Sequence, residues 1–174
     1  MTCPKCATGS IPLAATMNNA TFLGFDVDAS RIQKRLDTRY IDEIASSIEE
    51  GIERAVHYKN QGISKSIGVV ANAVDGLEML ISKGIIPDIL TDQTSAHDPV
   101  QGYVPSGLSK EELGYLKENN IDLYIQKSYD TMANHVRAML KLQDMGSIVF
   151  DYGNNLRAGA EQAGVENAFD FPGF

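Results

Sequence analysis

Basic residues are scarce in this sequence. Its 174 residues include 15 Lys and Arg against 23 Asp and Glu, which gives a formal net charge of -8 at pH 7. A nucleic-acid surface needs clustered Lys and Arg to meet phosphates, and an anionic membrane surface attracts the same residues. The composition therefore predicts neither a nucleic-acid partner nor a membrane partner.

Long apolar runs are absent as well. No stretch approaches the roughly 20 apolar residues that a membrane-spanning helix needs. The first residues also lack the charged region and apolar core of a signal peptide. Hydrophobic residues at 43% and charged residues at 22% are ordinary for a globular protein. We therefore expect a cytoplasmic protein with one domain spanning residues 1–174.

Cysteine occurs only twice, as Cys3 and Cys6. A CxxC pair can be half of a zinc site or a redox pair. Zinc usually takes four ligands, and no second Cys pair or closely spaced His pair follows. A redox CxxC normally opens a helix after a strand, and no strand precedes Met1. We expect no native role for these thiols and no metal site.

Short β-branched runs alternate with longer amphipathic stretches, which is typical of βαβ units around a parallel sheet. The expected fold class is α/β and Rossmann-like, a mostly parallel sheet with helices on both faces. Its first strand is expected to be missing, because the chain begins at the loop that would follow that strand. Strands are expected at 21–27, 66–71, 84–90, 147–150 and from 168, and helices at 9–20, from 29, and at 40–59, 74–83, 110–119, 129–145 and 154–163.

An acidic residue, Asp26, closes the first expected strand. In a Rossmann-like fold, a carboxylate at this place accepts hydrogen bonds from the ribose hydroxyls and repels a 2′-phosphate, which favours NAD over NADP. Arg31, one turn into the next helix, is placed to reach adenine or ribose. The alternatives are a strand-end acid without a special role and an ordinary surface arginine.

A polar loop follows the apolar run at 84–90. Residues 91–99 are dense in hydroxyl, amide, imidazole and carboxylate groups. Crevices beyond the carboxyl ends of parallel strands bind ligands in α/β proteins, so this loop is a candidate site. The alternative is a solvated turn, because Thr, Asp, Gln and Ser are common loop residues.

Three side chains of this loop, Asp92, His97 and Asp98, could alternatively bind a metal ion. Such a site would need more partners than the loop offers. The other two histidines, His57 and His135, are expected within helices and without a special role.

Four sequence blocks carry a resemblance to a known family. They are residues 70–73 (VANA), 93–99 (QTSAHDP) followed by 102–105 (GYVP), 150–155 (FDYGNN) and 167–174 (NAFDFPGF). In order and spacing they resemble the signature of urocanase (urocanate hydratase), from about Pro12 to the last residue. The resemblance covers only the family's central dinucleotide-binding region, and the last block stops inside a family motif. We therefore expect a fragment of a larger urocanase-like chain.

The resemblance implies NAD as the cofactor and assigns contacts with it by position. The match to Val104 is approximate, and Asn72 has a second interpretation as the cap of the next helix. Besides Asp26 and Arg31, the implied NAD-binding residues are Asn72, Ala73, Gln93, Thr94, Ser95, Ala96, His97, Tyr103, Val104 and Tyr152, with Thr8 and Gly9 in the glycine loop.

The glycine loop departs from the family's pattern. Only Gly9 and the tail at 12–14 match, whereas Cys6 and Thr8 stand where the family has loop residues that touch NAD. A side chain there restricts positive φ and crowds the pyrophosphate. Because Thr8 and Ser10 can still donate hydroxyl groups, we expect weaker NAD binding rather than none.

The family's reaction is implied by the same resemblance. Urocanases add water to urocanate in histidine degradation and use NAD as a bound electrophile. Their catalytic cysteine lies in a region that these residues do not contain, and neither Cys3 nor Cys6 matches it. We expect an NAD-binding domain without catalytic residues, whose partner is the rest of a urocanase chain or a second copy in a homodimer. The alternative is a non-catalytic remnant or self-association module that has lost cofactor binding.

Overall fold

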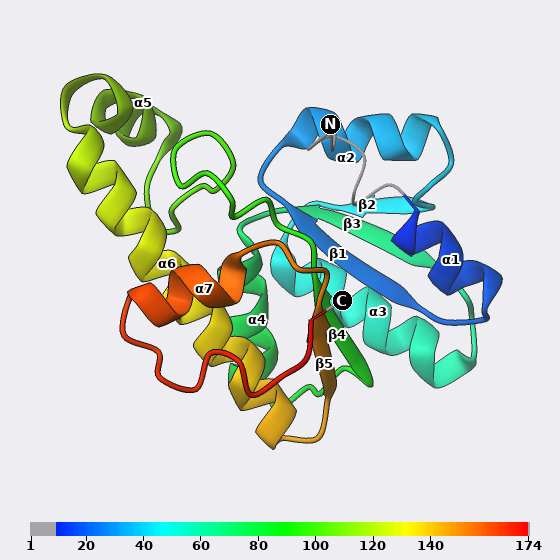
Figure 1. Ribbon diagram of the computed structural model, residues 1–174. Helices are drawn as coiled ribbons and strands as arrows, with labels where there is room; N and C mark the ends of the chain where they lie inside the picture. Colours follow the sequence, from blue (N-terminus) through cyan, green and yellow to red (C-terminus); the bar gives the residue numbers. More distant parts are fainter. Residues whose placement is uncertain (1–9, 174) are drawn as a thin grey trace. The chain divides into compact units, whose positions relative to one another are not determined.

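The computed structural model describes residues 10–173, so the predictions for Cys3, Cys6, Thr8 and Gly9 lie outside the described residues. In this range the strands pair in parallel and alternate with helices (Figure 1), which confirms the predicted α/β class. The strands form two sheets, and the chain divides into two compact units, 1–79 and 80–174.

The N-terminal unit is a parallel sheet with the strand order β1-β3-β2. Helices α2 and α3 cover opposite faces of this sheet, as Figure 1 shows. Strand β3 is central, and β1 pairs with it from Phe22 opposite Ser66 to Asp26 opposite Val70. In chain order the elements are α1 (Ile11–Met17), β1 (Phe22–Asp26), α2 (Ala29–Asp37), β2 (Glu43–Ala45), α3 (Ile48–Gln61), β3 (Ser66–Val70) and α4 (Ala73–Ser82), whose last residues belong to the second unit.

Two glycines let chain segments approach each other closely in this unit. A Cβ atom at Gly51 of α3 would lie 2.6 Å from Cγ2 of Val69, and one at Gly68 would lie 2.8 Å from Cδ1 of Ile41. Successive strand residues point to opposite faces, so Val69 faces α3 while Gly68 faces the other side. The buried core toward α3 contains Ala45, Ile67 and Val69, with Leu23, Phe25, Ile48, Ala55, Tyr58 and Ala71 packed against it.

The helix predicted at 40–59 is wrong in its first part. Residues 43–45 form β2, which pairs with β3, and α3 begins only at Ile48. The Ser47 hydroxyl accepts a hydrogen bond from the Glu50 N–H at 3.1 Å and thereby caps the helix. Isoleucines spaced by three and four residues suit a helix, but pairing with a central strand overrides that local pattern.

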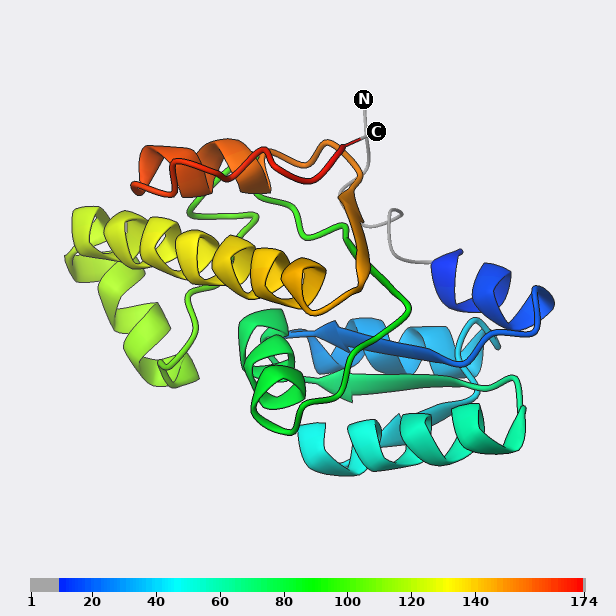
Figure 2. The same cartoon turned by 90° about the horizontal axis from the view of Figure 1, so that it is seen from below.

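The C-terminal unit has a parallel pair of strands, β4 and β5, in register from Ile89 opposite Ile148 to Asp92 opposite Asp151. Helices α6 and α7 lie side by side (Figure 2). Met132 and Met139 of α6 and Leu156 of α7 are completely buried. In chain order the elements are β4 (Ile89–Asp92), α5 (Lys110–Asn119), α6 (Ile121–Asp144), β5 (Ile148–Asp151) and α7 (Leu156–Gln162).

Several boundaries in this unit differ from expectation. Strand β4 starts at Ile89 rather than at 84, and α6 starts at Ile121 rather than at 129. The described part of the terminal strand expected from 168, residues 168–173, contains a single bridge, between Gly173 and Asp151. Ser109 and Glu112 form a capping box at the start of α5. No helix among residues 10–173 combines the length and apolar character that crossing a membrane requires.

Candidate functional site

Acidic residues stand at the carboxyl ends of strands in both units. Asp26 ends β1, Asp92 ends β4 and Asp151 ends β5. The side chains of Asp92 and Asp151 are 7% and 1% exposed, and that of Asp26 is 13% exposed. The strand ends where α/β sheets bind ligands therefore carry carboxylates that the fold holds in place.

Asp26 is held by its own turn and by two arginines of α2. Its Oδ1 accepts a hydrogen bond from the Asp28 N–H at 2.9 Å. Nη1 of Arg31 lies 3.9 Å from Oδ1, and Nη1 of Arg35 lies 3.7 Å from Oδ2. These ion-pair distances are longer than hydrogen bonds. Both oxygens thus keep capacity to accept hydroxyl donors, and the Arg31 side chain, 47% exposed, stands beside them.

Asn72 and Ala73 lie at the same end of the N-terminal sheet. Because Asp26 is opposite Val70 in the register, Asn72 follows two residues beyond that pair. Its Oδ1 accepts a hydrogen bond from the Val74 N–H at 3.2 Å, so the interpretation of Asn72 as a helix cap is confirmed. Ala73 is the first residue of α4. The N-terminus of a helix favours anions, because the N–H groups of its first turn point outward there.

In the C-terminal unit, Asp92 is the centre of a buried polar cluster. Its Oδ2 accepts a hydrogen bond from the Thr94 N–H at 3.0 Å, and its Oδ1 accepts one from the Thr94 hydroxyl at 2.7 Å. The side-chain amide of Asn154, which follows β5, also donates to Oδ2. Nε2 of His135 on α6 lies 3.7 Å from Oδ1. One carboxylate therefore organises the segments that follow both strands.

The far end of the polar loop is fixed by a tyrosine. The hydroxyl of Tyr103 lies 3.3 Å from Nδ1 of His135, and the Tyr124 hydroxyl donates to the Tyr103 carbonyl at 3.1 Å. Between the two ends, Oδ1 of Asp98 accepts hydrogen bonds from the N–H groups of Val100 and Gln101 at 2.8 and 2.9 Å. These two bonds lower the pKa of Asp98. The loop thus has a defined conformation of its own.

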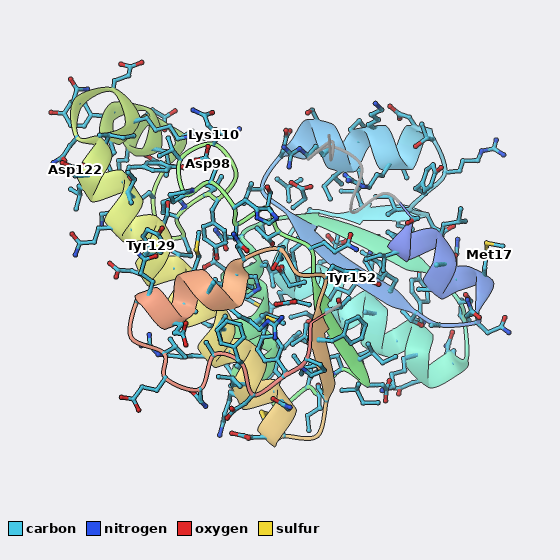
Figure 3. All side chains as sticks on the ribbon, viewed as in Figure 1. Met17, Asp98, Lys110, Asp122, Tyr129 and Tyr152 are labelled. Atoms are coloured by element: carbon cyan, nitrogen blue, oxygen red, sulfur yellow. The ribbon has the colours of Figure 1, made fainter. Side chains whose placement is uncertain are left out.

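The residues implied as NAD contacts differ in their access to solvent. His97 is exposed. Tyr152 (labelled in Figure 3) follows β5 and is 45% exposed. Its ring makes an edge contact with the ring of Phe150. Gln93, Thr94, Ser95 and Val104 are half-buried. Tyr103 and Ala96 are only 2% and 6% exposed, so these two side chains pack into the interior of the C-terminal unit.

An ion pair stabilises the other strand end. Nε of Arg157 donates to Oδ2 of Asp151 at 2.6 Å, and its Nη1 donates to the Phe171 carbonyl at 2.9 Å. The guanidinium also lies 5.0 Å from the Phe169 ring centroid and 5.7 Å from that of Phe171. Arg157 thereby holds the last described residues against the end of β5.

The alternative of a metal site at Asp92, His97 and Asp98 finds no support in the geometry. Asp92 and Asp98 accept hydrogen bonds from their own loop, and His97 is exposed. Across residues 10–173, no three His, Cys, Asp or Glu side chains are grouped as metal ligands.

Parallel strands, helices on both faces of a sheet and acidic strand ends define a Rossmann-like fold of the nucleotide-binding kind. The family model of the urocanase Rossmann-like domain matches residues 7–174 of this chain. The chain therefore belongs to the urocanase family, as the four sequence blocks indicate.

Sequence reasoning missed His135 and Asn154 and gave Asp92 no role beyond the metal alternative. A signal was available for His135, because Met132, Val136 and Met139 place it on the apolar face of a helix. A histidine on such a face is buried and needs a polar partner. The partner itself is distant in sequence and could not be identified from the spacing.

Proposed function

We propose that this chain is the NAD-binding domain of a urocanate hydratase. In the N-terminal unit, Asp26 accepts hydrogen bonds from the adenosine ribose hydroxyls, with Arg31 beside the ribose. The backbone at Asn72 and Ala73 lies at the same sheet end. In the C-terminal unit, ligand contacts come from the loop at 93–97 and from Tyr152, which is accessible. The observation that carries the proposal is the mostly buried carboxylate at the end of β1 in a urocanase-family chain.

The residues present fit a dinucleotide in two respects. Asp26 has carboxylate oxygens whose arginine neighbours lie at 3.9 and 3.7 Å, so ribose hydroxyls can still be accepted. Oε1 of Gln93 is buried and has no hydrogen-bond partner among the described residues. A buried acceptor without a donor is costly, and a carboxamide or hydroxyl of a ligand would supply that donor.

When bound, NAD supplies an electrophilic ring that activates the urocanate side chain for the addition of water. The residues of this chain bind and orient the cofactor, and Asp92 holds the loop that carries Gln93. Because neither Cys3 nor Cys6 matches the family's catalytic cysteine, we propose that this chain does not catalyse hydration alone. Its partner is then further urocanase sequence or a second copy of the chain.

Replacing Asp26 separates a ribose contact from a purely structural role. We expect Asp26→Ala to weaken NAD binding at least about tenfold, because two hydrogen bonds to a charged acceptor are lost. NADP should gain affinity in the same variant, because the repulsion of its 2′-phosphate is removed while Arg31 and Arg35 remain. Calorimetric titration of both dinucleotides into the wild-type and variant chains measures these changes.

Asp37→Ala is the matched control, since Asp37 lies exposed on the last turn of α2 and accepts a hydrogen bond from the side-chain amide of Gln33 at 2.8 Å. It should leave both affinities unchanged. Undiminished NAD binding by Asp26→Ala would refute the ribose role. A wild-type chain that gives no binding heat at millimolar NAD would favour the alternative of a non-catalytic remnant.

A further inference from the structure

His135 is a buried histidine that is not among the proposed NAD contacts. It lies on α6 and is 2% exposed, and its helix neighbours Met132 and Met139 are fully buried. Both ring nitrogens nevertheless face polar atoms. Nδ1 lies 3.3 Å from the Tyr103 hydroxyl, and Nε2 lies 3.7 Å from Oδ1 of Asp92. His135 therefore faces both ends of the polar loop at once.

The protonation of this group follows from its surroundings. Burial lowers the pKa of His135, although the Asp92 carboxylate acts in the opposite direction. Burial also raises the pKa of the Tyr103 phenol above its usual range, and Asp92 acts in the same direction. At neutral pH the imidazole is accordingly uncharged, and the phenol keeps its proton.

One tautomer satisfies these contacts. With the proton on Nε2, that N–H points toward the Asp92 carboxylate, and Nδ1 can accept a hydrogen bond from the Tyr103 hydroxyl. With the proton on Nδ1, the lone pair of Nε2 would face a carboxylate oxygen across 3.7 Å, which is repulsive. The protons are therefore directed one way along the cluster: the Tyr103 hydroxyl donates to His135, and the Nε2–H of His135 is directed at Asp92.

We propose that His135, as the neutral Nε2–H tautomer, is a positioning residue for the loop between Asp92 and Tyr103. It ties both ends of the loop to α6 and so sets the position of residues 93–97. The inference rests on the proposed function, in which those residues contact NAD. His135 itself does not touch the cofactor.

The first test uses the full chain without ligand. Long-range ¹⁵N NMR of the imidazoles should show His135 as the neutral Nε2–H tautomer, with the exposed His57 and His97 as references. Hydrogen exchange by mass spectrometry should show amides at 94–103 exchanging about tenfold faster or more in His135→Gln and in Tyr103→Phe. Amides of α7 should be unchanged. His57→Gln, on the exposed face of α3, is the matched control and should alter neither region.

The second test titrates NAD into the same variants. We expect His135→Gln to weaken binding about tenfold and His57→Gln to leave it unchanged.

The proposal is overturned if His135 is charged or carries its proton on Nδ1. It is also overturned if loop exchange is unaffected in folded variants, or if exchange accelerates while NAD affinity stays the same. A wild-type chain that binds no NAD refutes the proposed function, whereas the tautomer and exchange data still decide whether His135 positions the loop. Should His135→Gln fail to fold, Tyr103→Phe and the wild-type spectrum decide it.

Discussion

Arg157→Leu is expected to lower the free energy of unfolding of the C-terminal unit by about 3–5 kcal/mol. The substitution keeps an apolar side chain but removes the cation that pairs with Asp151, whose side chain is 1% exposed. The carboxylate would then keep only the hydrogen bond from the Gly153 N–H, and the Phe171 carbonyl would lose its donor. Urea unfolding followed by circular dichroism and tyrosine fluorescence measures the loss, since the sequence contains no Trp.

Two further variants show whether the buried charge is the cause. Arg137→Leu, at an exposed position of α6, should leave the unfolding midpoint nearly unchanged. Combining Arg157→Leu with Asp151→Asn should recover part of the stability, because it removes the unpaired charge. If Arg157→Leu alone changes the stability no more than Arg137→Leu does, the ion pair does not hold this strand end.

Asp92→Asn is expected to destabilise the same unit by about 3 kcal/mol, although it changes the side-chain volume very little. The Asp92 carboxylate accepts hydrogen bonds from the Thr94 N–H, the Thr94 hydroxyl and the Asn154 amide. An amide at position 92 would direct an NH₂ group against one of these donors. The same unfolding experiment measures this loss, and amide exchange at 93–97 reports the loosened loop.

The swapped variant Asp92→Asn with Asn154→Asp provides the specific test. With its NH₂ group in the place of Oδ2, the amide introduced at position 92 can donate to the new carboxylate at 154, and its oxygen, in the place of Oδ1, can still accept from the Thr94 hydroxyl. We expect a partial recovery of stability. Asp98→Asn is the control in the same loop, and should leave the unfolding curve unchanged, because both of its bonds to Val100 and Gln101 use one oxygen. A swap that is less stable than Asp92→Asn alone would contradict this account of the cluster.

Local signals in the sequence were sufficient for much of the fold. The Asp28 cap of α2 and the capping box at Ser109 each join residues only a few positions apart in the sequence. The strand ending at Asp26 is confirmed, because its apolar residues are bounded by clear polar signals. Such features depend on neighbouring residues, which the sequence presents directly.

Features that depend on distant partners were not predictable in the same way. Residues 43–45 form a strand only because β3 is available to pair with them. Among the described residues 168–173, Gly173 alone forms a bridge, with Asp151, and the Phe171 carbonyl accepts a hydrogen bond from Arg157. Tertiary contacts of this kind override local propensity.

The candidate site also combines features that neighbouring residues determine with features that depend on distant partners. The loop at 93–97 and Asp26 could be found from polar residues that follow apolar strands. The burial of Tyr103 and its contact with His135 join residues 32 positions apart in the sequence. No spacing rule links a loop tyrosine to a histidine on a long helix, so the cluster around Asp92 required the structure.

Titration of NAD into the ¹⁵N-labelled full chain, followed through assigned backbone amides, tests the central claim most directly. The account predicts saturable shifts at residues 26–31 and 72–73 of the N-terminal unit and at residues 93–97 of the C-terminal unit. Amides at 111–115 of α5 should not move. The absence of any saturable shift at millimolar NAD, or shifts confined to α5, would contradict the assignment of this chain as an NAD-binding domain.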